Sequence, residues 1–181
     1  MLLKTFLFTS SLSLVSLAGC GYAPGDADSA PEGLGLTTRV VLQGRTWTLR
    51  FTAPAGYGMS NGTDAVTIGA KSSGARGQAK FVGGAYDGDL AKFLDAAFAS
   101  LSSNGKAQHV AGQSGSVNGI PTLSATVSAQ DSSGNAMDVT VTAYAFAPKQ
   151  AYAMIVLQPR GAGQGDLAAL VQSVRRMSAA E

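Results

Sequence analysis

The sequence predicts an α+β fold in which an antiparallel β-sheet is covered by two main helices. Residues 38–181 contain several segments in which apolar and polar residues alternate, the pattern of half-buried strands. Two further segments place apolar residues three and four positions apart, which is the spacing of an amphipathic helix. The last three expected strands are joined by short connections, so they are expected to form an antiparallel meander rather than a doubly wound parallel sheet.

The strands are expected where this alternation is clearest. In the segment 46–52, Trp47 and the apolar residues two and four positions later alternate with polar residues, so Trp47 is expected in the core. Gly44 marks the turn before that segment, and Pro54 follows it because proline has no N–H to donate to a sheet. The expected strands span residues 39–42, 46–52, 65–70, 78–86, 122–130, 136–146 and 151–158.

The two helices are expected over residues 89–103 and 166–178, where the apolar residues fall on one face. Asp87 or Asp89 can cap the first helix, because a carboxylate there accepts hydrogen bonds from free backbone N–H groups. The second helix is expected to carry Arg175 and Arg176 near its C-terminal end, where the helix dipole favours positive charge.

The N-terminal residues contain a motif of membrane targeting. Leu17-Ala18-Gly19-Cys20 follows an apolar stretch too short to span a bilayer, and Lys4 supplies a positive charge upstream. This run resembles the lipobox of bacterial lipoproteins. The resemblance implies cleavage before Cys20, a diacylglyceryl thioether on the Cys20 sulfur and usually a third acyl chain on the new amino terminus. Gly21 stands where an Asp would retain such a protein at the inner membrane, so the resemblance favours the outer membrane, facing the periplasm.

These features divide the chain into three parts. Residues 1–19 are expected to be a lipoprotein signal peptide, 20–37 a lipidated flexible tether and 38–181 a single α+β domain. The tether is rich in Gly, Pro and small polar residues, which cannot bury much apolar area. Two or more acyl chains anchor a protein stably, so a processed Cys20 is expected to hold the domain at a membrane.

The composition excludes several classes of function. Charged residues make up 13% of the chain and the net charge is +2, so the protein lacks the dense positive field that nucleic-acid binding requires. The single cysteine leaves no disulfide framework and no thiolate metal cluster. The single histidine, His109, removes metal sites that need a pair of histidines. No cofactor, metal site or catalytic set is therefore expected.

Three motifs have both a chemical and a structural interpretation. His109 is the only candidate for a hydrolase centre, and it is otherwise an ordinary strand or loop histidine. Asp87-Gly88-Asp89 offers two carboxylates to a cation, although helix capping explains both. A glycine-rich run precedes the second helix, and its spacing does not fit the dinucleotide-binding fingerprint. Its glycines are Gly161, Gly163 and Gly165.

A partner surface is predicted near the start of the domain. Tyr57 lies in a glycine-rich loop and is expected to be an exposed aromatic residue, with Arg45 and Arg50 nearby. Tyrosine and arginine are enriched among the residues that dominate binding energy at interfaces. Tyr57, Arg45 and Arg50 are therefore the candidate partner-binding residues.

Several short motifs resemble a known accessory domain. Gly44-Arg45-Thr46-Trp47, the run 51–57, Asn118-Gly119-Ile120-Pro121 and Arg176-Met177-Ser178 are similar to the domain behind the catalytic unit of some periplasmic zinc metallopeptidases. The order of elements is also similar to PsbP-related and Mog-type domains. These resemblances imply an antiparallel sheet flanked by helices that serves as an accessory or binding module. The chain lacks the HExxH motif of the peptidase unit itself.

The leading functional hypothesis is a non-enzymatic, membrane-anchored lipoprotein that binds an envelope protein partner. The alternative is a periplasmic carrier of a small apolar ligand or lipid, and a hydrolase built around His109 is a third hypothesis. A partner-binding module predicts an exposed aromatic patch near Tyr57. A carrier predicts an enclosed apolar cavity between sheet and helix.

Overall fold

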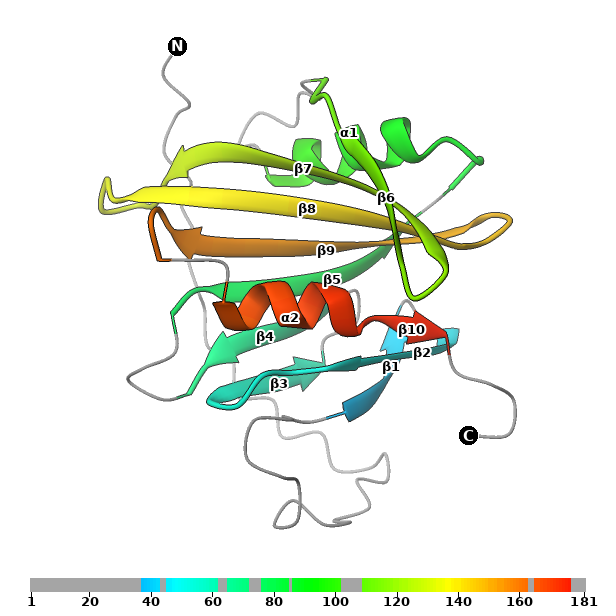
Figure 1. Cartoon of the computed structure of the whole chain (residues 1–181), viewed down its shortest axis with the longest axis horizontal. Coiled ribbons are helices and arrows are strands. Elements are labelled where there is room, and N and C mark those ends of the chain that lie inside the picture. Colours follow the sequence, from blue (N-terminus) through cyan, green and yellow to red (C-terminus); the bar gives the residue numbers. More distant parts are fainter. Residues whose placement is uncertain are drawn as a thin grey trace.

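A computed structural model describes residues 37–42, 45–61, 65–71, 76–84, 86–101, 109–162 and 165–176. The expected signal peptide, most of the tether, Gly44 and Gly163 lie outside these residues. Within them, strands form two antiparallel sheets and two helices pack on opposite faces of the larger sheet (Figure 1).

The larger sheet has seven strands in the order β3-β4-β5-β9-β8-β7-β6, and every neighbouring pair is antiparallel. Its centre is the expected meander, and the strand 65–70 has the expected bounds. The strands are β3 (Tyr57–Asn61), β4 (Ala65–Ala70), β5 (Gln78–Gly84), β6 (Gln113–Val117), β7 (Ile120–Gln130), β8 (Ala136–Ala147) and β9 (Gln150–Pro159).

A second, three-stranded sheet has the order β1-β2-β10. The expected strand pair near the N-terminus is confirmed as β1 (Thr37–Leu42) and β2 (Arg45–Thr52). The two-residue strand β10 (Arg175–Arg176) joins the other edge of β2. This small sheet therefore brings the first and last described strands of the chain together.

The expected α+β fold class is wrong, because the helices are too short to cover the sheet. The first, α1 (Leu90–Leu101), has 12 residues and the second, α2 (Gly165–Ser173), has nine. At a rise of about 1.5 Å per residue they are about 18 Å and 14 Å long. Seven strands about 4.8 Å apart span about 29 Å. The described part of the molecule is mainly antiparallel β-sheet, with one short helix on each face.

One local prediction is also corrected, and two strands were not expected. The second helix stops at Ser173 rather than residue 178, because Arg175 and Arg176 pair with β2. The strands β3 and β6 were not expected, and four of the five residues of β6 are exposed, so its sequence shows no alternation. A two-residue turn, Asn118-Gly119, connects β6 to β7. Both residues have positive φ, 49° and 75°, as a tight hairpin connection requires.

The face of the sheet under α1 is built from small residues. Ala125, Ala143 and Ala153 are among several buried alanines of the central strands, and they leave room for Phe93 and Leu94 of the helix. Interiors are close-packed, so small side chains on one element match large ones on the other. These small residues allow α1 to pack closely against β7, β8 and β9.

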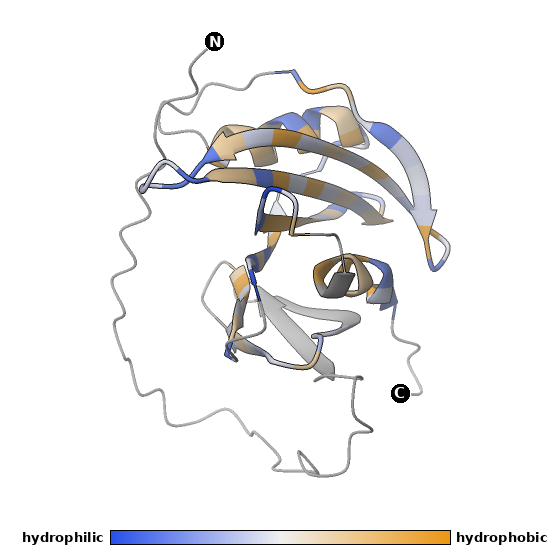
Figure 2. Cartoon of the chain, turned by 60° about the vertical axis from the view of Figure 1, so that its left-hand side comes forward, coloured by the Kyte–Doolittle hydropathy of each residue, from blue (hydrophilic) through white to orange (hydrophobic). Residues whose placement is uncertain are grey.

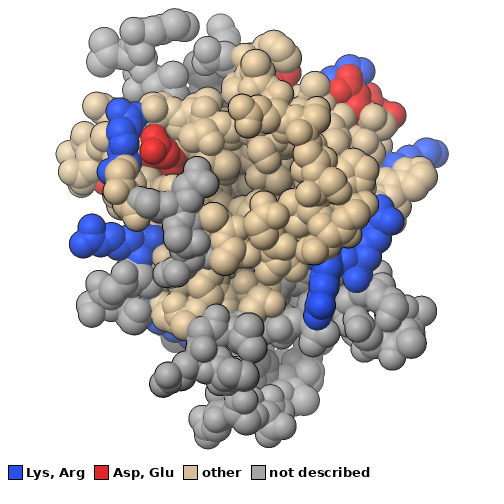
Figure 3. All heavy atoms as spheres, in the orientation of Figure 1, with Lys and Arg blue, Asp and Glu red and all other residues tan. Residues whose placement is uncertain are grey.

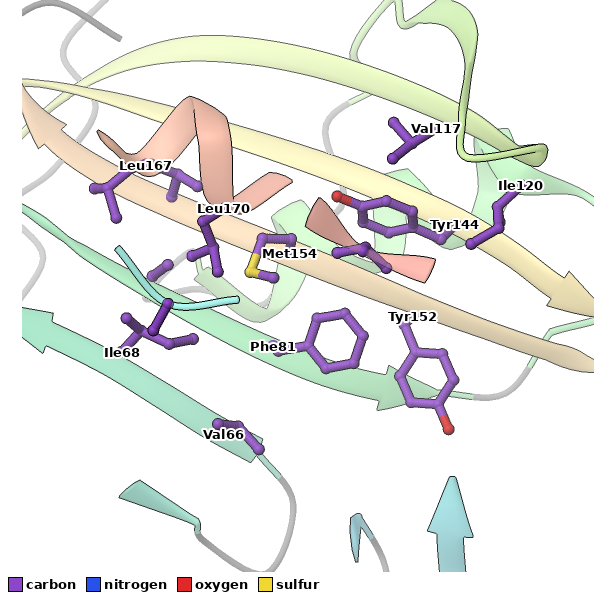
Figure 4. Close-up of a cluster of buried hydrophobic side chains, with 14 of the residues drawn as sticks. Val66, Ile68, Phe81, Val117, Ile120, Tyr144, Tyr152, Met154, Leu167 and Leu170 are labelled. Atoms are coloured by element: carbon purple, nitrogen blue, oxygen red, sulfur yellow. The ribbon is translucent and has the colours of Figure 1, made fainter. Parts of the chain in front are cut away.

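The opposite face carries the larger core cluster. Leu167 and Leu170 of α2 point toward this face, which holds an aromatic group and Met154 (Figure 4). The rings of Phe81 and Tyr152 stack with centroids 5.0 Å apart. Figure 2 shows α1 and α2 on opposite sides of the large sheet, and α2 also contacts β2 of the small sheet. The helix therefore contacts both sheets.

A groove with a hydroxyl floor

An open groove of about 600 Å³ lies between the large sheet and α2. Its floor crosses the strands β7, β8 and β9, and α2 forms one wall. The floor residues are Ser124, Ala125, Thr126, Thr140, Thr142, Val156 and Gln158. The wall residues are Leu167, Ala168, Val171 and Gln172, and Ala111 and Gln113 close one side.

The floor contains two hydrogen-bonded hydroxyl pairs. The Ser124 hydroxyl donates to Oγ1 of Thr142 at 2.8 Å, and Oγ1 atoms of Thr126 and Thr140 lie 2.8 Å apart. Both pairs are direct cross-strand neighbours of β7 and β8. A hydroxyl donates one hydrogen bond and accepts two, so each pair retains one proton and several lone pairs for a ligand.

The wall is fixed at its C-terminal end by four hydrogen bonds. The Tyr144 hydroxyl donates to the Val171 carbonyl at 3.0 Å. The Asn118 side-chain amide donates to the carbonyls of Gln172 and Val174, both at 2.9 Å. The Ser173 hydroxyl accepts a hydrogen bond from the N–H of Thr52 at 2.8 Å. These contacts connect α2 to β8, to the β6–β7 turn and to the small sheet.

The groove is uncharged. None of its lining residues is Asp, Glu, Lys, Arg or His. Figure 3 shows the same property on the face that carries α2 and β6, where the centre is free of charged atoms and these gather toward the margins. Arginine forks bind phosphates and carboxylates, and carboxylates bind hard cations, so this lining suits a neutral ligand with both donors and acceptors. No group of three His, Cys, Asp or Glu residues lies together in the described part of the chain.

The expectation that Tyr57 is exposed is wrong. Its side chain is 7% exposed and belongs to the core cluster. Its hydroxyl donates to the Arg76 carbonyl at 2.7 Å and accepts from the Arg76 N–H at 3.2 Å. Tyr57 therefore fixes the segment before β5, and it offers no exposed aromatic patch to a partner.

The other candidate residues are placed as follows. Arg45 and Arg50 lie in β2, and their side chains fall outside the described part of the structure, as does that of Trp47. Cys20 also lies outside it, so lipidation stays a prediction. Whether Tyr57 and these arginines share a surface is therefore a prediction that lies outside the described residues.

His109 forms an exposed pair with an acidic residue of α1. Its Nδ1 atom lies 3.0 Å from Oδ2 of Asp95, and its side chain is 76% exposed. The other carboxylate oxygen of Asp95 accepts a hydrogen bond from the Val110 N–H at 3.2 Å. Asp95 therefore attaches the chain before β6 to α1, on the side of the sheet opposite the groove.

The expected capping of α1 is confirmed for Asp89, and Asp87 supports the residue before the helix. Oδ1 of Asp89 accepts hydrogen bonds from the N–H groups of Ala91 and Lys92, at 2.9 and 3.2 Å. The Asp87 carboxylate accepts from the Asp89 N–H and pairs with the Lys92 ammonium. The Asp89 N–H and the Lys92 side chain lower the pKa of Asp87. Both carboxylates therefore serve the helix terminus.

A second hollow lies at the end of α1 and has a volume of about 130 Å³. Small-molecule sites occupy about 300–1,000 Å³, so this hollow is too small for a lipid. Asp131 on its rim has a lowered pKa, because the Asn135 side chain and backbone donate hydrogen bonds to its carboxylate. Its apolar walls come from Leu101, Ala129, Met137, Val139 and Leu157.

Comparisons with known proteins show the fold alone. No protein-family model matches the chain, and no curated protein sequence matches it. A protein of Bacteroides thetaiotaomicron superposes with a TM-score of 0.56 at 7% identity, covering 83% of this chain and 51% of that one. The chain thus spans about half the length of the Bacteroides protein. LpqN, involved in cell envelope biogenesis of Mycobacterium tuberculosis, superposes with a TM-score of 0.50 at 12% identity, covering 79% of this chain and 91% of LpqN.

These comparisons leave the sequence resemblances as predictions. Because no family model matches, the comparisons do not test the resemblance to the lipobox, to the peptidase accessory domain or to the PsbP-related domains. Within the described residues, no helix combines the length and the apolar character that a membrane crossing needs.

Proposed function

We propose that the chain is a non-enzymatic accessory module of the cell envelope that binds a protein partner in the groove beside α2. The observation that carries this proposal is the uncharged groove with paired hydroxyls on its floor. The proposal replaces the partner surface expected around Tyr57, which is buried.

The chemistry of the lining supports an extended polypeptide segment as the ligand. Hydroxyls and the side-chain amides of Gln113, Gln158 and Gln172 each donate and accept, as do the N–H and C=O groups of a peptide backbone. The apolar side chains of Leu167 and Val171 supply a wall for aliphatic side chains of the partner.

The proposed location is the periplasmic face of the outer membrane, with Cys20 as the lipid anchor. The support is the lipobox-like run before Cys20 and the fold shared with LpqN, which is involved in cell envelope biogenesis. No cofactor is proposed. A carrier of apolar ligands is not proposed, because the larger described cavity has a polar floor and the apolar hollow is small.

The anchor is tested first by the intact mass of protein extracted from membranes. The wild-type chain is expected to lack residues 1–19 and to carry acyl mass, whereas a Cys20→Ser variant carries none. An unacylated wild-type protein would remove the anchor from the proposal and leave the groove untouched.

The groove is tested by site-specific photocrosslinking in the same membranes. A photoreactive residue replacing Gln172 at the groove is expected to capture one envelope protein, and the same residue replacing Lys80 on the other face of the sheet is not. Replacing both Thr126 and Thr140 with Val removes one hydroxyl pair without changing shape, so this double variant is expected to fold and to lose the crosslink.

The matched control is the exposed cross-strand hydroxyl pair of Ser60 and Thr67, which lies far from the groove lining in the sheet order. A Ser60→Ala/Thr67→Val variant should crosslink from position 172 like the wild type. If the control variant and the groove variant lose the crosslink equally, the hydroxyl floor is not the binding element.

A further inference from the structure

The β6–β7 turn holds an Asn-Gly pair in contact with the end of α2. Asn118 and Gly119 are both exposed, and Figure 1 shows the turn beside the C-terminal end of the helix. The side-chain nitrogen of Asn118, Nδ2, donates to the carbonyls of Gln172 and Val174, both at 2.9 Å. One side-chain nitrogen therefore makes both of these contacts between the turn and the end of α2.

The same pair has the sequence of a labile site. Asparagine is a chemically labile residue, and it deamidates most readily before glycine, because glycine has no Cβ to obstruct attack by its own backbone nitrogen. The register pairs Val117 with Ile120, so the Gly119 N–H lies in the turn and outside the ladder. Chain neighbours apart, no described atom lies within 4 Å of the place that a Cβ of Gly119 would occupy. The attacking nitrogen is therefore accessible to water.

We propose that Asn118 is a deamidation site and that its reaction releases the C-terminal end of α2. In the first step, the Gly119 backbone nitrogen bonds to Cγ of Asn118, the bond between Cγ and Nδ2 breaks, and ammonia leaves with the Gly119 proton. Water then opens the resulting five-membered imide and gives aspartate or isoaspartate at position 118. The new acid loses its proton at neutral pH, so the reaction consumes only water and adds one negative charge.

The nitrogen that leaves in this reaction is the one that holds the helix. Both possible products carry a carboxylate, which accepts hydrogen bonds and donates none, so neither can bond to the carbonyls of Gln172 and Val174. The C-terminal end of a helix also carries a partial negative charge, which repels a carboxylate. Deamidation therefore replaces two attractive contacts with repulsion.

Contact with α2 and deamidation compete for the same amide group. While Nδ2 donates to both carbonyls, the Asn118 side chain is held against the helix, and the turn keeps its positive φ of 49°. Formation of the imide requires this side chain to leave its partners. The reaction is thus slow while the end of α2 is in place, and it is irreversible once ammonia has left.

The affected end of α2 is the part that borders the groove. Val171 and Gln172 line the groove, and the Tyr144 hydroxyl holds the same turn of the helix through the Val171 carbonyl. Deamidation therefore loosens one wall of the groove. The inference rests on the contacts of α2, so it is independent of the ligand that the groove binds.

The first measurement follows deamidation of the purified protein at neutral pH by the masses of its proteolytic peptides. Two other pairs, Asn61-Gly62 and Asn104-Gly105, share the motif, so the peptides assign each event to its site. Asn118 is expected to deamidate in the folded protein, at a lower rate than in the urea-unfolded chain. Absence of the reaction in the folded protein, or equal rates in the two states, would overturn the inference.

Two variants separate local release of α2 from global unfolding. Tyr144→Phe removes a contact at the end of α2, whereas Asp89→Ala removes the cap of α1 on the other face of the sheet. Loss of one hydrogen bond shifts a local equilibrium by about tenfold, so Asn118 should deamidate about tenfold faster in Tyr144→Phe and at the wild-type rate in Asp89→Ala. Equal acceleration in both variants would assign the reaction to unfolding, and no acceleration in either would remove its link to α2.

The effect on the helix is measured on Asn118→Asp, which carries the aspartate product from the start. The amide hydrogens in the last turn of α2 are expected to exchange at least about tenfold faster than in the wild type, and those of α1 at the same rate. Unchanged exchange in α2, or equal acceleration in α1, would show that the carboxylate does not release the helix end. If the variant does not fold, wild-type protein aged to partial deamidation provides the same comparison.

Discussion

Tyr144 connects the centre of the sheet to the wall of the groove. Its side chain is fully buried, and its hydroxyl satisfies the Val171 carbonyl near the end of α2. A Tyr144→Phe variant leaves that carbonyl without its partner and is expected to lose about 1–2 kcal/mol of unfolding free energy. Urea unfolding at neutral pH checks this value, and an unchanged midpoint would show that the contact does not stabilise the wall.

The same residue predicts how stability depends on alkaline pH. Burial raises the pKa of Tyr144 above its ordinary value of 10.0. The unfolded state therefore releases the phenol proton first, so this contribution to stability is complete below pH 10 and is lost as pH rises beyond it. Between pH 9 and 11, the unfolding free energy should fall more steeply with pH for the wild type than for Tyr144→Phe. Parallel curves would contradict the prediction.

At the residue scale, the alternation of residues within strands was easier to predict from the sequence than the exposure of individual side chains. The alternation in 136–146 already separates Thr140 and Thr142 from Val141, which is the signal that points to the groove floor. The burial of Tyr57 could not be predicted, because its hydroxyl partner, Arg76, is 19 residues away. A local glycine-rich context suggested a loop, whereas pairing with β4 makes Tyr57 the first residue of a strand.

At the element scale, the N-terminus of α1 depends on one capping residue. An Asp89→Ala variant removes the acceptor for two N–H groups and is expected to lose about 1 kcal/mol. Asp89→Asn keeps an oxygen in the same place and should retain most of the stability. Thermal unfolding of both variants tests the cap, and equal losses would indicate a role of charge rather than of capping.

The C-terminus of α2 depends on Asn118, which lies in the β6–β7 turn. Asn118→Gly preserves the positive φ of the turn and removes the two hydrogen bonds to Gln172 and Val174. The variant is expected to lose about 1 kcal/mol and to expose the last turn of α2 to faster amide hydrogen exchange. If exchange in α1 accelerates equally, the loss is global and the turn has no specific role in holding α2.

Element prediction succeeded where the periodicity was local and failed where pairing was distant. The face of α1 follows from the spacing of Phe93, Leu94, Ala97 and Phe98, and all four are buried. The strand β6 is mostly exposed, so its residues show no alternation that would predict a strand. The end of α2 depends on β2, more than a hundred residues earlier, which competes for Arg175. The local sequence around α2 therefore cannot predict where the helix ends.

At the scale of the whole molecule, the two faces of the large sheet carry separate core clusters. An Ala143→Leu variant adds volume between β8 and α1, where Ala143 is fully buried. It is expected to destabilise the protein by about 1–3 kcal/mol, because a packed core resists larger side chains. Crosslinking from the groove at position 172 should persist at temperatures where the variant is folded. Loss of that crosslink in the folded variant would show that the faces are coupled.

The whole architecture was the least predictable level. The antiparallel meander follows from short connections, but the fold class does not, because strands such as β3, β6 and β10 add to the sheets without a pattern of their own. Both helices were expected longer than they are. Whether a helix covers a sheet depends on the helix length and on the number of strands in the sheet. Both quantities depend on pairing between segments that are distant in the sequence.

The contact between Thr52 and Ser173 also defines a mechanical path. Thr37, the first residue of β1, is the register partner of Thr52, and the Thr52 N–H donates to Ser173 at the end of α2. Tension on the chain that precedes Thr37 is therefore applied next to the groove wall, through one strand pair and one hydrogen bond. A module pulled by its tether would feel that load first at the helix that borders its binding groove.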